Sequence, residues 1–113
     1  MTYQARSPVE SFETRGDAVD RYQYDESLLA VADGIYVGYI TIAIFTYDSK
    51  ENPEIHVKMV EVLAGYRRRG VASALYEEME KKLRVERPRW DGVVRTGFQT
   101  EDGAAFFSSV TAL

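Results

Sequence analysis

Three consecutive arginines at residues 67–69 precede a glycine and open a segment with helical spacing of apolar residues. The first backbone N–H groups of a helix have no acceptor within the helix, and the positive end of the helix dipole attracts anions there. Gly70 and Ala72 carry little or no side chain where an anion must approach the backbone. Convergent amides and three guanidinium groups therefore predict a pyrophosphate-binding site. Its expected members are Arg67, Arg68, Arg69, Gly70, Val71 and Ala72.

An arginine run before a helix can also be no more than a solvated turn, so the surrounding pattern decides between the two interpretations. Arg67 is followed after two residues by Gly70 and after one more by Ala72. This pattern occurs by chance about once per thousand positions, and the strand before it and helix after it make it rarer. No Gly-Lys-Ser/Thr and no Gly-x-Gly-x-x-Gly occurs here, which excludes two other phosphate-binding loops.

A strand and a helix must position this loop. Alternating apolar and polar residues predict a strand over residues 54–63 that becomes buried toward Val62. After the loop, apolar residues recur at helical spacing until Pro88, and Glu78 and Lys82 are spaced for an exposed ion pair. The apolar residues of this expected helix are Val71, Ala74, Leu75, Met79 and Leu83.

The other expected strands flank this unit in sequence. The runs 28–32 and 35–45 are rich in β-branched and aromatic residues, and Asp33-Gly34 between them is a strong hairpin signal. Residues 90–98 form a plausible strand that would run parallel to the strand at 54–63 through the helical crossover.

Helices are expected at both ends of the chain. Ser7-Pro8-Val9-Glu10 has the form of a capping box and predicts a short helix, and Asp17 can cap a second helical segment through Tyr24. Thr100 or Asp102 would cap a last helix ending near Val110. The expected fold class is α/β with a mixed sheet: two helices, three strands, a helix, a strand and a helix.

Length and composition limit the function classes. The chain has 113 residues, of which 45% are hydrophobic, so one globular domain over residues 1–113 is expected. It has no cysteine and only one histidine, His56, which excludes disulfides, thiolate zinc sites and multi-histidine metal centres. No apolar run is long enough for a membrane span, and the first 15 residues are too polar for a leader peptide. We expect a cytoplasmic protein without membrane contact.

The charge is distributed unevenly. The formal net charge is -4, but residues 66–95 hold nine basic and five acidic residues, +4, which leaves -8 for the rest. A basic third suits a nucleic acid, a membrane headgroup or a small polyanion such as a phosphorylated cofactor, and charge alone does not choose among them. Nucleic-acid binding is disfavoured because glutamates separate the basic residues at the two ends of the helix and the pI is about 5.0.

The loop and its flanks resemble the GNAT superfamily of acetyl-CoA-dependent N-acetyltransferases. The family motif Arg/Gln-x-x-Gly-x-Gly/Ala is matched by Arg67, Gly70 and Ala72, with Val62 upstream and Leu75 inside the helix. The hairpin at residues 32–40 is similar to the family's paired second and third strands. The resemblance covers residues 28–83 and implies the GNAT-like acyltransferase fold, without its last two strands because the sequence ends at Leu113.

The resemblance also implies a cofactor and a reaction. The loop would hold the pyrophosphate of acetyl-CoA (coenzyme A), the backbone of Val60 and Val62 would pair with its pantetheine arm, and Thr100 takes the place of a family asparagine in the last helix. The acetyl group would pass to a primary amine, on a small molecule or a protein lysine. An open acceptor side would suit a large acceptor or completion by a second subunit in a homodimer.

Two residues are candidates for the general base. His56 occupies the position of a family carboxylate and is expected on the strand face of Val60 and Val62; the alternative is a surface histidine. Glu61 is expected to interrupt the apolar face of the same strand, as a base or as a structural ion-pair partner. Phe107 stands where the family has its proton-donating tyrosine, which leaves a second possibility: a degenerate CoA-binding or protein-inhibitor module.

Overall fold

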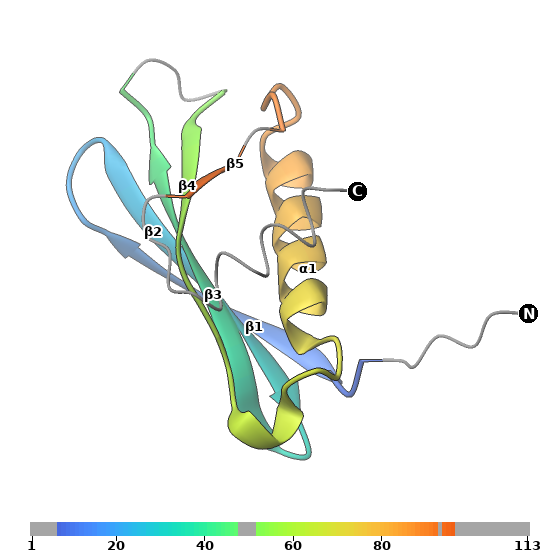
Figure 1. The fold of residues 1–113 in the computed structure, drawn as a ribbon. Coiled ribbons are helices and arrows are strands. Elements are labelled where there is room, and N and C mark those ends of the chain that lie inside the picture. The colour runs from blue at the N-terminus through green and yellow to red at the C-terminus, as the bar shows by residue number, and fades with distance from the viewer. Residues whose placement is uncertain (1–6, 48–51, 93, 97–113) are drawn as a thin grey trace, which may run out of the picture.

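In the part of the chain that the structure describes, a five-stranded sheet carries one long helix on one face (Figure 1). The computed structural model describes residues 7–47, 52–92 and 94–96. The strand order follows the chain order, β1 to β4 are antiparallel, and β5 pairs parallel with β4 after the helical crossover. The mixed α/β class is therefore confirmed. The elements are β1 (Ser11–Ala18), β2 (Gln23–Ala32), β3 (Ile35–Phe45), β4 (Glu54–Val62), the 3-10 turn η1 (Ala64–Tyr66), α1 (Val71–Glu86) and β5 (Val94–Thr96).

The hairpin of β2 and β3 is confirmed at its turn. Asp33 and Gly34 both have positive φ angles, 53° and 76°, as a two-residue turn between twisted strands requires. β2 begins at Gln23, which is earlier than the predicted start at Leu28. Its additional residues pair with both neighbouring strands.

The predicted N-terminal helices are wrong, because this part of the chain forms β1 and the start of β2. Ser7 Oγ accepts a hydrogen bond from the Val9 N–H at 3.3 Å, which closes a local turn and starts no helix. Asp20 Oδ1 accepts from the N–H groups of Tyr22 and Gln23, so Asp20 caps the turn between β1 and β2. β1 pairs with β2 along its whole length, whereas the apolar stripe of this segment is too thin to hold a helix against the core.

The core lies between the sheet and α1. Of the apolar residues predicted for α1, Val71, Leu75, Met79 and Leu83 are buried, whereas Ala74 is only half-buried. Alternate residues of β2 and β3 are buried as well. At Gly38 a side chain would come within 2.9 Å of the Glu61 carbonyl oxygen and 3.1 Å of Val71, so glycine lets the start of α1 pack closely on β3. The main core residues are Leu28, Ala30, Val37, Ile40, Ile42, Ile44, Ile55, Val57, Val71, Leu75, Met79 and Leu83.

A bulge at Lys58 changes which face of the sheet each β4 residue occupies. Thr41 pairs with Met59 and Ile42 pairs with Val57, so Lys58 is one extra residue without a partner on β3. Strict alternation is therefore broken at this point. Ile55 and Val57 belong to the core, and Val60 and Val62, beyond the bulge, pack against it as well.

The bulge overturns two expectations about faces. His56 lines a cavity on the outer face, away from α1, so it does not share a face with Val60 and Val62. Glu61 does not interrupt the apolar face of Ile55 and Val57, because it lies on the outer side and is exposed.

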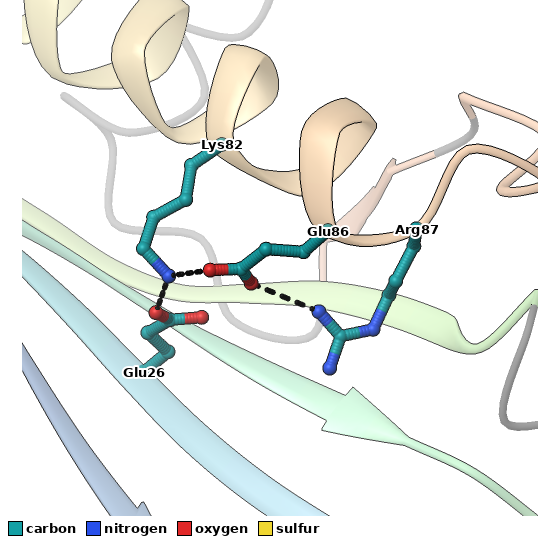
Figure 2. Close-up of polar contacts among 4 residues, drawn as sticks. All are labelled: Glu26, Lys82, Glu86 and Arg87. Carbon is teal, nitrogen blue, oxygen red and sulfur yellow. Dashed lines mark hydrogen bonds and ion pairs between the residues drawn. The ribbon is translucent and has the colours of Figure 1, made fainter.

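A cluster of charged groups joins α1 to the sheet (Figure 2). Lys82 forms ion pairs with Glu26, which is buried on β2, and with Glu86, which also pairs with Arg87 at 3.2 Å. The predicted pair with Glu78 is replaced by these contacts. Burial lowers the pKa of Lys82, but the hydrogen bonds with Glu26 and Glu86 outweigh this effect and raise it above 10.5.

The C-terminal part is described only as far as β5. β5 is parallel to β4 as predicted but spans Val94–Thr96, and Trp90, predicted to begin it, is buried in the turn after α1. Thr100, Phe107 and the predicted last helix lie outside the described residues. Within the described ranges, no helix is long and apolar enough to cross a bilayer.

Candidate functional site

The loop between β4 and α1 presents free backbone amides. Gly70, with φ 79°, is the residue before the helix and has no side chain with which to cap this end of α1. The first helical bond in the ladder joins the Ala74 N–H to the Gly70 carbonyl at 3.0 Å. The N–H groups of Val71 and Ala72 therefore precede the ladder, as the sequence predicted. Arg68, with φ 62°, turns the chain so that the loop curls around this end.

The positive charges of the three arginines are not neutralised by carboxylates of the described residues. All are exposed, and none forms an ion pair with a carboxylate in the part of the chain that the structure describes. Arg67 Nε donates to the Val62 carbonyl at 3.1 Å and thereby holds the end of β4. The Arg69 guanidinium lies 5.1 Å from the ring centre of Tyr66. Positive charge at the loop is thus left for a bound anion.

The loop is held in place by the hairpin turn. The Tyr66 hydroxyl donates to Asp33 Oδ2 at 2.6 Å, and this hydrogen bond is the main cause that raises the pKa of Tyr66. The Asp33 N–H donates in turn to Glu10 Oε1 at 3.1 Å. From sequence, Asp33 was interpreted only as a turn residue, and nothing in the spacing pointed to Tyr66 as its partner.

A groove of about 970 Å³ runs from this loop along β4. β4 pairs with β5 only at Ile55–Val57, so among the described residues no strand covers the edge of β4 from Lys58 to Val62. Val60 and Val62 line the groove together with Arg67, Arg68 and the first residues of α1. The predicted cofactor-binding residues that are described are therefore contiguous. Arg69 is the exception, because it belongs to the loop but not to the groove lining.

These residues fit coenzyme A. The first amides of α1 and the arginine side chains, which have no carboxylate partner among the described residues, match a diphosphate. The edge of β4 from Lys58 to Val62, which no described strand covers, matches an arm that carries amide groups. Among the residues that the structure covers, no cluster of histidine and carboxylate side chains could hold a metal ion.

The two candidate bases lie in different surroundings. His56 Nε2 is 3.3 Å from Glu54 Oε1, and its ring packs edge-on against Phe45 with centroids 5.2 Å apart. Glu61 lines the groove, and its Oε2 accepts a hydrogen bond from the Tyr39 hydroxyl at 2.9 Å. Of the two candidate bases, Glu61 lines the groove and His56 does not, and the role of each as a base stays a prediction.

Tyr39 is a site residue that the sequence analysis missed. Its hydroxyl lies 2.9 Å from both Glu61 Oε2 and Met59 Sδ. Burial is the first cause that raises the pKa of Tyr39, and the hydrogen bond and negative charge of Glu61 raise it further. Alternation along β3 could have placed this ring on the outer face, but the bulge that brings Glu61 there is not visible in the pattern.

The family of the chain follows from comparison with known proteins. Residues 2–89, which include the loop and its open amides, match the model of the acetyltransferase (GNAT) family. The chain belongs to the GNAT family. The family predicted from the Arg67 motif is therefore confirmed, and so is the GNAT fold class.

Solved GNAT structures share this fold. A ribosomal-protein-alanine N-acetyltransferase from Brucella melitensis biovar Abortus 2308 is 26% identical with a TM-score of 0.64, covering 80% of this chain. An aminoglycoside acetyltransferase from an uncultured soil metagenomic sample is 24% identical with a TM-score of 0.64, covering 81%. The aminoglycoside N-acetyltransferase AAC(6')-Iy, solved in complex with CoA, is 18% identical with a TM-score of 0.56, covering 83%.

The chain is shorter than these neighbours. The matched part covers 62%, 60% and 60% of their respective lengths. None of the curated protein sequences matches the chain.

Proposed function

We propose that this protein is an N-acetyltransferase that moves the acetyl group of acetyl-CoA to a primary amine. The observation that carries the proposal is the N-terminus of α1, where Arg67 and Arg68 line a groove next to the first amides of the helix. This groove continues along the edge of β4 from Lys58 to Val62, which no strand covers among the described residues. If the arginines formed only a solvated turn, nothing would require this turn to lie at the end of a groove along a strand edge. One structural neighbour with the same fold was solved in complex with CoA, which supports CoA as the ligand to test.

Each part of the groove has a task in this reaction. The amides of Val71 and Ala72 and the arginines bind the diphosphate, and the edge of β4 orients the arm so that the thioester lies near Lys58 to Val60. A protonated amine cannot attack a carbonyl carbon, so a base must first remove its proton. Glu61 is the described carboxylate that lines the groove at this point.

Turnover is the direct test of this function. The full chain should release CoA thiol from acetyl-CoA only when a primary amine is present, and mass spectrometry should show a gain of one acetyl group on that amine. A matched tertiary amine serves as the control, because it cannot form a stable amide. CoA binding without acetylation of any amine would instead identify a degenerate CoA-binding module.

The base can be assigned by two conservative variants. We expect Glu61→Gln to lower kcat/KM about 100-fold with unchanged affinity for CoA, because loss of a general base typically costs 10²–10⁴-fold. His56→Asn should lower it less than about fivefold, because His56 lies outside the groove and contacts Glu54 and Phe45. Steady-state kinetics with one amine and calorimetry with CoA measure both quantities. The reverse order of effects would assign the base to His56.

A further inference from the structure

The strand β1 forms one edge of the sheet, and β5 forms the opposite edge beside β4. One side of β1 pairs with β2 over all eight of its residues, and no described strand covers its other side. All residues of β1 except Phe12 are exposed. The uncovered side of a strand presents a row of backbone donors and acceptors with which a further strand can pair. The charges along β1 indicate which strand fits there.

Two opposite charges of β1 lie on the same face of the sheet. The Glu13 carboxylate accepts a hydrogen bond from the Tyr36 hydroxyl, and Arg15 Nη2 donates to the same hydroxyl at 3.3 Å. The Arg15 guanidinium also lies 5.6 Å from the centre of the Tyr36 ring. Neither Glu13 nor Arg15 forms an ion pair within the described ranges of the chain. Tyr36 thus orients a carboxylate and a guanidinium that both lack a counter-charge.

A second copy of β1 can pair with this edge in the antiparallel direction, around a two-fold axis. Residues that lie directly opposite each other in such a pair point to the same face of the sheet. Neighbouring residues of one strand point to opposite faces, so the axis must pass through a residue and not between two residues. This condition leaves two registers with the longest overlap. The axis at Thr14 pairs residues 11–17 with their copies, and the axis at Arg15 pairs residues 12–18.

Charge distinguishes these two registers. With the axis at Thr14, Glu13 faces Arg15 of the partner subunit, and the symmetry makes this contact twice. With the axis at Arg15, two arginines face each other, and Glu13 faces Asp17 of the partner subunit. Opposite charges in such positions stabilise a strand pair and like charges destabilise it. The sequence of β1 therefore favours the axis at Thr14.

The same register also matches side-chain size on the inner face. Phe12 packs against the core on this face and lies opposite Gly16 of the partner subunit. A Cβ atom at Gly16 would come within 1.5 Å of the Tyr24 hydroxyl, so this position needs glycine in the single chain. An aromatic ring opposite an edge glycine covers the bare backbone there. Both faces of the strand pair are thus complementary in one register.

We propose that β1 pairs with β1 of a second copy, antiparallel and with the two-fold axis at Thr14, so that one sheet continues through both copies. The contact involves one strand from each copy, so the dimer is weak and dissociates on dilution. It lies at the edge of the sheet opposite β4 and β5, so the groove along β4 stays open. This dimer therefore goes beyond the proposed function and does not complete the acceptor side of that site.

Charge reversal tests the partners across the axis. By analytical ultracentrifugation at about 100 µM, we expect the full chain to be a dimer that dissociates on dilution. Arg15→Glu and Glu13→Arg should each associate at least tenfold more weakly, because like charges then face each other. An equimolar mixture of the two variants should form a heterodimer with the parent affinity. Arg21→Glu is the matched control, since it changes the charge equally at an exposed residue outside β1.

A single thiol tests the register. The chain has no cysteine, so Thr14→Cys places one thiol at the axis, opposite its own copy. Directly opposite residues lie within the Cα distance that a disulfide requires, so we expect mild oxidation to link this variant as a dimer. Asp17→Cys is the control on the same exposed strand. Its two copies would lie six residues apart, or about 20 Å, and should remain unlinked.

Three results would overturn the proposal. The first is a monomer at every concentration. The second is a dimer that Arg15→Glu and Arg21→Glu weaken equally, which would place the contact elsewhere. The third is faster linkage of Asp17→Cys than of Thr14→Cys, which would exclude this register. None of these measurements uses acetyl-CoA, so their outcome is separate from that of the turnover experiments.

Discussion

Replacing Ala72 by glutamate is expected to weaken CoA binding at least 100-fold and to leave the melting temperature unchanged or slightly higher. Ala72 is the second residue of α1, where the backbone N–H groups precede the hydrogen bonds of the helix. A carboxylate at this end of a helix is favourable by about 0.3–1 kcal/mol. The same carboxylate occupies the amides and repels the diphosphate, so binding is lost although the helix is stabilised.

Ala72→Gln separates charge from size in this experiment. Glutamine has nearly the same length as glutamate but no charge, so we expect a smaller loss of CoA affinity and no increase in melting temperature. Calorimetry with CoA and thermal unfolding of the three proteins measure both effects. Full CoA affinity in the Ala72→Glu protein would remove the start of α1 from the binding site.

The largest expected effect on stability comes from Lys82→Met, about 3 kcal/mol. Lys82 joins α1 to the buried carboxylate of Glu26 on β2, with Glu86 and Arg87 completing the cluster (Figure 2). Methionine keeps the apolar stem but leaves Glu26 buried without its cation. Breaking one partner of a buried ion pair typically costs about 3–5 kcal/mol, and the partial exposure of Lys82 places this case at the lower end. Chemical denaturation at pH 7 measures the difference.

Controls distinguish the buried charge from loss of packing. Lys81→Met changes an exposed neighbour and should alter the free energy of unfolding by less than about 0.5 kcal/mol. The double variant Glu26→Gln with Lys82→Met should recover much of the lost stability, because no unpaired charge remains. A single Lys82→Met variant as stable as the parent protein would show that the pair contributes nothing.

The pH dependence of this pair has a defined direction. The pKa of Lys82 is raised in the folded protein, so its contribution is fully present below the ordinary lysine value of 10.5. The contribution is lost as the pH rises through the higher folded value. The stability difference between the parent protein and Lys82→Met should therefore stay constant from pH 7 to about pH 10 and shrink above it.

The sequence predicted correctly those elements whose conformation depends on residues within the element itself. Asp33-Gly34 specifies its turn through two positive φ angles, and the helical spacing from Val71 to Leu83 specifies the buried face of α1. The N-terminal segment was mistaken for helices because capping residues such as Ser7 and Asp17 also suit turns and strand ends. The segment forms a strand and not a helix because it pairs with β2, which lies outside the segment.

The candidate site was predictable where it depends on backbone chemistry. Gly70 and the arginines before α1 indicated an anion site from their types and spacing alone. The structure places them at the N-terminus of the helix, and anion binding there stays a prediction. The positions of His56 and Glu61 were not predictable, because one extra residue at Lys58 moves everything beyond it to the opposite face. Local periodicity also cannot show contacts between distant residues such as Glu26 and Lys82, which are 56 residues apart in the sequence.

The agreement between strand order and chain order has a consequence for how this chain folds. Each of the first four strands adds to the edge of the strand before it, so assembly needs only short loops to close and no strand has to insert between two others. The parallel pairing of β4 with β5 is the exception, because it closes a loop that contains all of α1. This closure loses the most chain entropy, which makes a late docking of β5 onto a preformed meander the favoured folding route.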